Sequence, residues 1–425
     1  MLSRRSFLAL SSLGAATAWP AAAQTPEAPS GRIPAAIAAL RSREREARPI
    51  TQGERAIRLE KARRLMTEHR IDAVMLTGGT SLVYFTDIRW GVSERLFAMV
   101  LPRSGAPFFV CPAFEEGRAL EQIAAGPFDG SPDIRTWHEH ESPYQRVAQG
   151  LADRGLTTGR VGMEETVRFV FGDGVAAATP ALDVVSGTPV VAGCRMVKDA
   201  HEIELMRLAS EVTLAAYEAA YRSLEEGMTQ RDFARLVSMA HDHLGFAGNA
   251  GVQVGEYSAL PHGSRTPQVI RQGTILLIDG GCVVADYRSD LSRTFVLGTA
   301  TDKMKHVFEI VRRAQDAALE AATPGVACEA VDAAARRVVE DAGFGPDYAH
   351  FTHRVGHGLG MDMHEWPYLV RGNTLPMTPG MTFSDEPGVY LPGEFGVRVE
   401  DDMAITEDGA ILLTPQSPSL EEPFS

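Results

Sequence analysis

The segment Gly273-Thr-Ile-Leu-Leu-Ile-Asp-Gly-Gly-Cys-Val-Val-Ala-Asp-Tyr-Arg-Ser-Asp-Leu-Ser-Arg-Thr294 places two acidic residues beside predicted strands. The apolar run 275–278 ends at Asp279, and a second segment ends at Asp290 before the strand-like run 293–296. We therefore predict two carboxylates at neighbouring strand edges, joined by a turn. Burying two aspartates is costly unless a partner compensates their charge, and a bound metal ion is the simplest general explanation.

Three later segments supply further ligand types. His357 lies between glycines in Gly-His-Gly-Leu-Gly, and Glu386 follows a short strand in Phe-Ser-Asp-Glu-Pro-Gly. Glu400 ends the alternating run Val-Arg-Val-Glu, in which Arg398 faces the same way. Taken singly, such residues are commonly turn, surface or packed residues. Together they are compatible in type, and each lies beside glycine or at a strand end.

The donor set of four carboxylates and one imidazole suits Mn, Co, Zn or Fe(II) and excludes a soft thiolate site. Four carboxylates over-neutralise one divalent ion but balance two. The sequence therefore predicts a dinuclear site, with ions roughly 3.5–4 Å apart bridged by a water or hydroxide.

These motifs, in this order and with Asp279 and Asp290 eleven positions apart, resemble the metallopeptidase family of aminopeptidase P, prolidase and methionine aminopeptidase. The resemblance covers residues from about 195 to the C-terminus and implies the pita-bread fold. The five positions that bind metal in that family are matched by Asp279, Asp290, His357, Glu386 and Glu400. The preceding region resembles the creatinase/prolidase amino-terminal domain in length and rough pattern, which argues against methionine aminopeptidase.

The resemblance also implies roles for residues around this set. His262 would contact substrate, and His364 would contact the scissile carbonyl or the developing tetrahedral centre. His353, four positions before the predicted ligand His357, is a further catalytic candidate. For each histidine the alternative is a packed or solvent-facing imidazole. Arg398 would orient Glu400 or bind the substrate's carboxylate.

The predicted activity is hydrolysis of Xaa-Pro peptide bonds, of the aminopeptidase P or prolidase type, with two divalent ions and Mn as the first expectation. Glu386 would accept the proton of the attacking water and pass it to the leaving nitrogen. Trp366, Tyr368 and Tyr390 are candidates to line a pocket for the proline ring, and ordinary aromatic packing is the equal alternative. The alternatives are a pita-bread lyase or hydrolase acting on a small non-peptide substrate, and a non-catalytic peptide-binding scaffold.

Length and composition indicate two globular domains, and the family resemblance implies the fold class α+β. The chain has 425 residues, of which 44% are hydrophobic and 23% charged. We predict a linker with a polar helix over 24–52, an α/β domain over 53–194 and the pita-bread domain over 195–425. The formal charge of 41 − 55 = −14 disfavours nucleic acid as a partner. From the family's habit we expect a homodimer.

Local patterns predict the main elements. A helix is expected from about residue 53 to 69, and strands at 73–76, 97–101 and 108–111. Asp199 and Thr229 are predicted to cap two long helices, and a further helix is predicted over 328–342. The alternation of helices and strands after 195 suggests an approximate internal duplication.

The first residues have the pattern of an export signal. Arg4 and Arg5 precede an apolar stretch at 7–19, and three alanines at 21–23 offer a cleavage site. We predict a twin-arginine signal peptide over 1–23 and a periplasmic or exported protein of charge 39 − 55 = −16. The alternative is an uncut membrane anchor. No later apolar run is long enough to span a membrane, so no stable insertion is expected after cleavage.

The cysteine residues fit no zinc spacing, so they are expected as buried thiols or, alternatively, as disulfides. They are Cys111, Cys194, Cys282 and Cys328.

Overall fold

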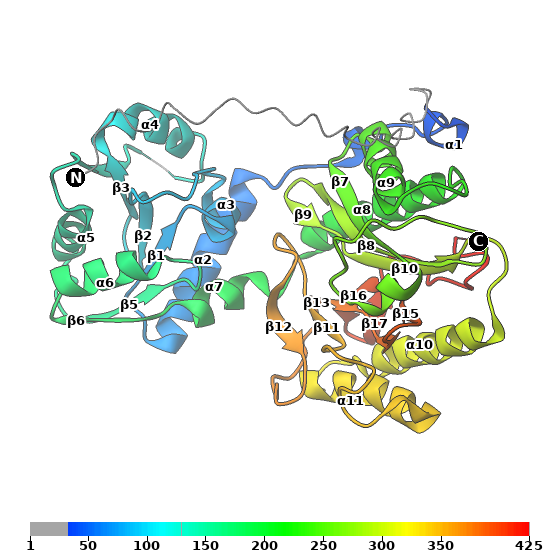
Figure 1. Cartoon of the computed structure of the whole chain (residues 1–425). Coiled ribbons are helices and arrows are strands. Elements are labelled where there is room, and N and C mark those ends of the chain that lie inside the picture. Colours follow the sequence, from blue (N-terminus) through cyan, green and yellow to red (C-terminus); the bar gives the residue numbers. More distant parts are fainter. Residues whose placement is uncertain (1–32, 129, 425) are drawn as a thin grey trace, which may run out of the picture. The chain divides into compact units, whose positions relative to one another are not determined.

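The computed structural model describes residues 33–128 and 130–424 (Figure 1). The predicted signal peptide over 1–23 lies outside the described residues. Residues from Ala35 onward belong to one unit, in which two regions of different architecture follow one another. Short elements precede the first region: α1 (Ala35–Ala38) and the 3₁₀ turn η1 (Glu44–Glu46).

The first region is built on a mixed six-stranded sheet of order β4-β3-β2-β1-β5-β6. Its strands are β1 (Ala73–Thr77), β2 (Ala98–Pro102), β3 (Phe108–Pro112), β4 (Asp133–Trp137), β5 (Gly159–Met163) and β6 (Leu182–Ser186). The helices are α2 (Gln52–His69), α3 (Thr80–Thr86), η2 (Ala113–Glu115), α4 (Glu116–Ala124), α5 (Pro143–Ala152), α6 (Phe169–Ala178) and α7 (Thr188–Arg195).

Helices cover both faces of this sheet because alternate strand residues are apolar on both sides. In β1, Val74 and Leu76 pack with residues of α2, α3, α4 and α7. Ala73 and Met75 pack on the opposite face with residues of α5 and α6. The predicted helix and strands of this region are confirmed to within two residues at either end.

The second region holds two antiparallel sheets, of order β10-β8-β7 and β12-β11-β13-β16-β17, and a hairpin of β14 and β15. Its strands are β7 (Gly248–Val254), β8 (Ile275–Val284), β9 (Tyr287–Arg288), β10 (Leu291–Val296), β11 (Gly356–Gly358), β12 (Glu365–Leu369), β13 (Thr382–Asp385), β14 (Gly388–Leu391), β15 (Phe395–Arg398), β16 (Asp401–Thr406) and β17 (Gly409–Leu412). The helices are α8 (Ala200–Tyr221), α9 (Gln230–Leu244), η3 (Gly255–Ala259), α10 (Asp302–Ala321), α11 (Cys328–Val339) and η4 (Glu340–Phe344).

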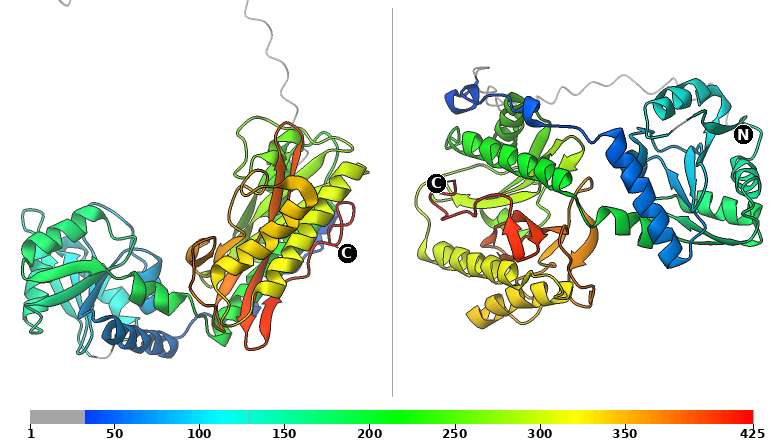
Figure 2. Two further views of the ribbon diagram at one scale, coloured as in Figure 1. Left: turned by 90° about the horizontal axis from the view of Figure 1, so that it is seen from below. Right: turned by 180° about the vertical axis from the view of Figure 1, so that it is seen from behind.

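Each sheet of the second region carries its own pair of helices. Residues of α8 and α9 share a buried apolar cluster with β7, β8 and β10. Residues of α10 and α11 share another with β13, β15 and β16. Figure 1 shows the sheets between the two helix pairs, and Figure 2 shows α10 and α11 side by side from below. The arrangement matches the internal duplication suggested by the order of elements.

The predicted helix caps are confirmed, but one helix end is not. Asp199 and Thr229 both form reciprocal capping boxes, with Glu202 and Asp232 respectively. The helix predicted over 328–342 ends at Val339, and its last residues belong to a π-helical segment. Gly343 in that segment has a φ of 88°, a left-handed conformation that breaks a regular α-helix.

The prediction that a strand ends at Asp279 is wrong. β8 continues to Val284, so Asp279 lies in the middle of a strand. Its two glycines allow close approach of neighbouring backbone rather than a turn: a Cβ on Gly281 would lie 1.9 Å from the carbonyl oxygen of Ser289. The turn comes later, where Ala285 and Asp286 have positive φ.

The cysteines follow the thiol alternative, because all four are free and buried. Among the described residues, no helix combines the length and the hydrophobicity needed to cross a bilayer.

Candidate active site

Acidic and imidazole side chains from separate strands converge beside β8. Their donor atoms form three overlapping groups, each within 4.8 Å. The groups are Asp279, Asp290 and Glu400; His357, Glu386 and Glu400; and Asp290, His357 and His364. The structure thus brings together the five predicted metal ligands and adds His364. Because Asp290, His357 and Glu400 each belong to two groups, the groups share donors, and the arrangement offers adjacent binding positions.

Strand register explains this convergence. In the pairing of β8 with β10, Asp279 lies opposite Ser292. Ser292 also forms an isolated bridge with Glu400, which joins the β8 sheet to the segment between β15 and β16. On the other side, the backbone N–H of His357 donates to the Ser384 hydroxyl at 3.1 Å, which fixes β11 beside β13 and Glu386.

His357 presents a bare nitrogen to the carboxylates. Its Nδ1 lies 3.1 Å from the carbonyl oxygen of Gly358, so Nδ1 carries the proton and donates. Its Nε2 is then unprotonated and faces Glu386 at 3.3 Å and Asp290 at 3.7 Å. Burial lowers the pKa of His357 to about 3, which keeps the ring neutral. A lone pair aimed between carboxylate oxygens fits a cation placed between them.

The carboxylates carry more negative charge than the chain neutralises. Burial raises the pKa of Asp290 and Glu386 well above their ordinary values. Burial and the nearby Asp279 raise the pKa of Glu400 to about 8. Among the described residues, Arg398 is the one arginine or lysine paired with these four carboxylates, so their formal charges and that of the guanidinium sum to −4 + 1 = −3. Oxygen and nitrogen donors with this excess of charge fit two divalent cations.

The Arg398 guanidinium uses its nitrogens in hydrogen bonds within and around this carboxylate cluster. Its Nη2 donates to Asp279 at 2.6 Å and its Nε to Ser292 at 2.9 Å. Its Nη1 donates to the Tyr390 hydroxyl at 2.9 Å, and the side chain is buried. Of its two predicted roles, this geometry favours orienting the carboxylates over binding a substrate.

His353 belongs to the same hydrogen-bond chain. Its Nε2 accepts from the Tyr390 hydroxyl at 2.8 Å, and its Nδ1 donates to the carbonyl oxygen of Arg354 at 2.8 Å. Burial and Arg398 lower the pKa of His353 to about 3. A neutral ring with both nitrogens occupied is a positioning group, so this contact gives His353 a different role from direct catalysis.

His364 and His262 both line the cavity that contains the carboxylates. The exposed ring of His364 lies 3.8 Å from that of His357, centroid to centroid. Its Nδ1 accepts from Nη2 of Arg354 at 3.3 Å, which leaves the proton on Nε2. His262 is also exposed and therefore accessible to a ligand.

The cavity, of about 910 Å³, differs from the predicted proline pocket. Its lining contains none of Trp366, Tyr368 and Tyr390. Tyr390 is buried beneath it, and Tyr368 lies under the Arg354 guanidinium, 4.1 Å from ring centroid to Cζ. The prediction failed because strand alternation does not show which face meets the cavity. Sequence reasoning missed four lining residues that carry no motif signal on their own: Asn249, Gln253, Tyr348 and Arg354.

Comparisons with known proteins agree with this geometry. The sequence profile named Metallopeptidase family M24 matches residues 204–407, and the profile named Creatinase/Prolidase N-terminal domain matches residues 58–197. The Probable dipeptidase PepE of Mycobacterium tuberculosis (strain ATCC 25618 / H37Rv) is 36% identical over 84% of this chain and 93% of its own length. The chain belongs to metallopeptidase family M24.

Two further relatives extend the similarity. The Xaa-Pro dipeptidase of Lactobacillus delbrueckii subsp. lactis is 30% identical over 85% of this chain and 98% of its own length. The crystal structure of Dipeptidase PepE from Mycobacterium ulcerans superposes with a TM-score of 0.82 at 33% identity, covering 88% of this chain and 99% of that one. Membership of the M24 family confirms the predicted fold class and metal-dependent peptidase activity, and implies divalent metal ions as cofactors.

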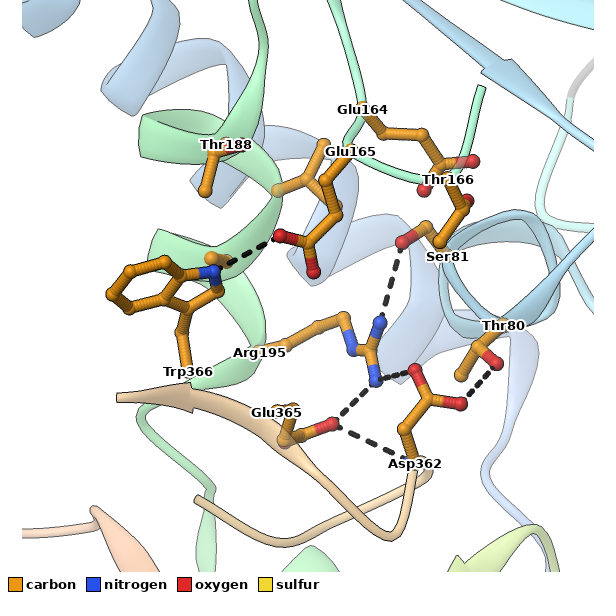
Figure 3. Close-up of a pocket in the computed structure, with 12 residues that line it drawn as sticks. Thr80, Ser81, Glu164, Glu165, Thr166, Thr188, Arg195, Asp362, Glu365 and Trp366 are labelled. Atoms are coloured by element: carbon orange, nitrogen blue, oxygen red, sulfur yellow. Dashed lines mark hydrogen bonds and ion pairs between the residues drawn. The ribbon is translucent and has the colours of Figure 1, made fainter. Parts of the chain in front are cut away.

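A second cluster of charged and largely buried side chains lies beside the small cavity of Figure 3. Arg195 pairs with Asp362 at 2.7 Å and also with Glu365, the residue after His364. Lys198 pairs with the same Glu365 at 2.6 Å. The adjoining cavity of about 20 Å³ has room for about one water molecule. We call these four residues the Arg195 cluster.

Proposed function

We propose that this M24 enzyme is an Xaa-Pro dipeptidase of the prolidase type that uses two divalent metal ions. One observation carries the proposal: four carboxylates and a neutral imidazole from separate strands face one another around adjacent positions. The names of its relatives, dipeptidase and Xaa-Pro dipeptidase, support the substrate class. An aminopeptidase P type of substrate, with further residues after proline, is the alternative within the same chemistry.

The residues that would hold the ions are those of the carboxylate site. They are Asp279, Asp290, His357, Glu386 and Glu400. Mn is our first choice of metal because oxygen donors dominate, and Zn, Co and Fe(II) fit the same donors. When bound, such ions lower the pKa of a water molecule and polarise a carbonyl oxygen.

Glu386 is the group that moves the proton. It lies at the wall of the cavity, with one oxygen 3.3 Å from Nε2 of His357 and the other 4.0 Å from Nδ1 of His353. A carboxylate at this place accepts the proton of an attacking water and delivers it to the departing proline nitrogen. The nitrogen of an Xaa-Pro bond has no hydrogen of its own, so a nearby proton donor is needed for it to leave as an amine.

His364 stabilises the oxygen of the scissile carbonyl. Because Arg354 donates to its Nδ1, its Nε2 carries a hydrogen and is free to donate into the cavity. A donor fixed in this tautomer needs no rearrangement when negative charge develops on the carbonyl oxygen. His262, which also lines the cavity, is the second candidate for contact with substrate.

The test is proline release from alanyl-proline by the purified protein, loaded separately with Mn, Zn, Co or Fe(II). We expect turnover that is lost on chelation and lost in Glu386→Gln. Cleavage of alanyl-proline to alanine and proline, without cleavage of Ala-Pro-Ala to alanine and Pro-Ala, indicates a dipeptidase, and the reverse indicates an aminopeptidase. A metal-loaded protein that cleaves neither peptide contradicts the proposal.

The remaining alternatives give different results in the same assay. A non-catalytic scaffold would contain little stoichiometric metal and release no proline. A lyase acting on a small sulfonium acid would form a volatile product from such a compound and leave the peptides intact. The intact ligand set favours the peptidase over both.

Two further proposals concern location and assembly. We propose export to the periplasm through the twin-arginine signal, which rests on Arg4 and Arg5 ahead of an apolar stretch. We also propose a homodimer, from the family resemblance alone. Fractionation of cells and light scattering of the purified protein test these two statements.

A further inference from the structure

His364 lies on a turn whose backbone, rather than the packing of its own ring, sets its position. The turn spans residues 360–364 between β11 and β12, and we call it the His364 turn. The ring of His364 is exposed and receives a hydrogen bond at 3.3 Å from Arg354. A group that acts in catalysis must be held within about 0.5 Å of its working geometry. The restraint on His364 must therefore come from contacts of the turn.

The segment before Asp290 holds the first half of this turn. The backbone N–H of Arg288 in β9 donates to the carbonyl oxygen of Gly360 at 2.8 Å. Its Nε donates to the carbonyl oxygen of Met361 at 3.0 Å. Because Arg288 lies two residues before Asp290, these bonds tie the turn to the segment of a predicted metal ligand.

Asp362 ties the turn to the first region of the chain. Its Oδ1 accepts from the Thr80 hydroxyl at 2.6 Å, and its Oδ2 accepts from Nη2 of Arg195 at 2.7 Å (Figure 3). Thr80 begins α3 and Arg195 ends α7, so both donors belong to helices of the first region. The backbone carbonyl oxygen of Asp362 also accepts from the N–H of Gly360 at 3.2 Å, so a shift of this residue moves the turn.

A third contact holds the strand that follows His364. Trp366 donates from Nε1 to a carboxylate oxygen of Glu165 at 3.0 Å, and Glu165 also belongs to the first region (Figure 3). The cavity lined by these groups has a volume of about 20 Å³, room for about one water molecule. Residues of the first region thus restrain the chain on both sides of His364.

We propose that Thr80 and Asp362 are positioning residues, which hold His364 where it donates to the oxygen of the scissile carbonyl. The first region thereby takes part in the reaction without touching the substrate. The proposal rests on the proposed function and adds two residues to it. Thr80 gives the cleaner test, because its hydroxyl is uncharged and its removal leaves the ion pairs of Arg195 in place.

The experiment measures kcat and KM for alanyl-proline with metal-loaded wild type and variants. We expect Thr80→Val to lower kcat about 3- to 10-fold and Asp362→Ala about 10- to 100-fold, with KM changed less than about twofold, because a displaced donor is lost at the transition state. Thr80→Ser keeps the hydroxyl and should match wild type. The control Thr67→Val should match it too, since it removes an exposed hydroxyl that donates within its own helix.

The same substitutions made together with His364→Ala are the decisive comparison. If Thr80 and Asp362 act through His364, their substitutions should change the residual kcat of His364→Ala by less than about twofold. Equal losses with and without His364 overturn the proposal, because a merely structural role would act in both backgrounds. A loss that falls on KM alone, or a Thr80→Ser variant as slow as Thr80→Val, also overturns it.

Amide hydrogen exchange of the His364 turn needs no substrate and so separates this proposal from the proposed function. We expect faster exchange over residues 360–364 in Thr80→Val than in wild type or Thr67→Val. If the metal-loaded protein cleaves no peptide but exchange rises in Thr80→Val, the proposed function fails and the restraint of the turn stands. Unchanged exchange overturns the restraint.

Discussion

The acidic cavity and the Arg195 cluster are two sets of buried charge that the chain treats in opposite ways. In the Arg195 cluster, Asp362 and Glu365 pair with Arg195, as Figure 3 shows, and Glu365 also pairs with Lys198, so the formal charges of these four residues sum to −2 + 2 = 0. In the cavity, four carboxylates face one paired arginine. The side chains of both sets are fixed by hydrogen bonds and ion pairs, so precise placement does not distinguish them.

The two sets differ in whether a bound ligand is needed to neutralise their charge. A cluster that balances its own charge is stable without any ligand. Removing one charged partner from such a cluster leaves a buried charge unpaired. A cluster with excess charge is destabilising until a ligand of opposite sign binds, which is the condition of a metal site. Substitutions that remove a carboxylate should therefore act in opposite directions at the two places.

The largest effect is expected from Asp290→Asn in the cavity. Turnover of alanyl-proline should fall at least about 10³-fold, equivalent to about 4 kcal/mol of transition-state stabilisation. The metal-free variant should unfold at the same temperature as metal-free wild type or higher, because burial raises the pKa of Asp290 and an amide removes the unfavourable charge. Thermal scans with chelator measure this.

The matched control for that substitution is Asp408→Asn in the exposed turn between β16 and β17, which should leave both activity and stability unchanged. A metal-free Asp290→Asn protein that melts well below wild type would show that the cavity, like the Arg195 cluster, is balanced without a ligand.

The opposite effect on the stability of the metal-free protein, a loss, is expected from Glu365→Gln in the Arg195 cluster. Lys198, whose side chain is 1% exposed, would lose its partner, at a cost of about 3–5 kcal/mol in the free energy of unfolding. Adding Lys198→Met should restore part of the loss. Urea denaturation of metal-free protein measures each step.

Glu394→Gln makes the same chemical change in a pair with Lys303 whose side chains are about half exposed. It should cost less than about 1 kcal/mol. Equal costs for Glu365→Gln and Glu394→Gln would remove the distinction between a buried and an exposed pair.

Metal removal should again distinguish the cavity from the Arg195 cluster, through a smaller change in the free energy of unfolding. With free metal at 100 times its dissociation constant, bound metal stabilises the fold by about 3 kcal/mol, and chelation removes this amount. Asp290→Asn should lose little on chelation, whereas the Arg195→Lys variant should lose as much as wild type. A wild-type protein whose melting temperature does not respond to chelator would contradict a metal site in the cavity.

The sequence could predict the carboxylate site because each contribution is local. Asp279, His357 and Glu386 each lie in a short motif with glycine or proline, and their types alone select a divalent cation. Long-range register then brings the motifs together, and the family resemblance supplied this register in advance. The strand boundary at Asp279 was wrong because glycine commonly marks a turn, but here it permits close packing of three strands.

The Arg195 cluster and the position of Arg354 could not be predicted in this way. Arg195 and Glu365 are 170 residues apart and belong to no shared motif. Arg354 is adjacent to a motif histidine, but only the pairing of β11 with β12 shows that its guanidinium lies over Tyr368. Charge–charge partners depend on tertiary placement, which residue type and spacing do not determine.

A buried histidine whose hydrogen-bond partners are neutral gives the smallest and most specific effect. The Nδ1 of His241 lies 2.9 Å from the carbonyl oxygen of Val237, and burial lowers the pKa of His241 from its ordinary value of 6.5 to about 4. Between these values the unfolded chain binds a proton that the folded chain does not, so stability falls as the pH drops below 6.5. The loss between pH 7.5 and pH 5 should be about 2 kcal/mol.

His241→Phe should remove this part of the pH dependence, measured as the difference in unfolding free energy between variant and wild type at each pH. His201 provides a control of opposite sign. Burial lowers its pKa, but its contact with Glu54 at 2.6 Å outweighs burial and raises the pKa overall. The stability that His201 contributes is present below pH 6.5 and is lost as the pH rises through its folded pKa. If His241→Phe and His201→Gln changed the unfolding free energy over the same pH range, the charge of a histidine's partners would not determine the direction of its effect on stability.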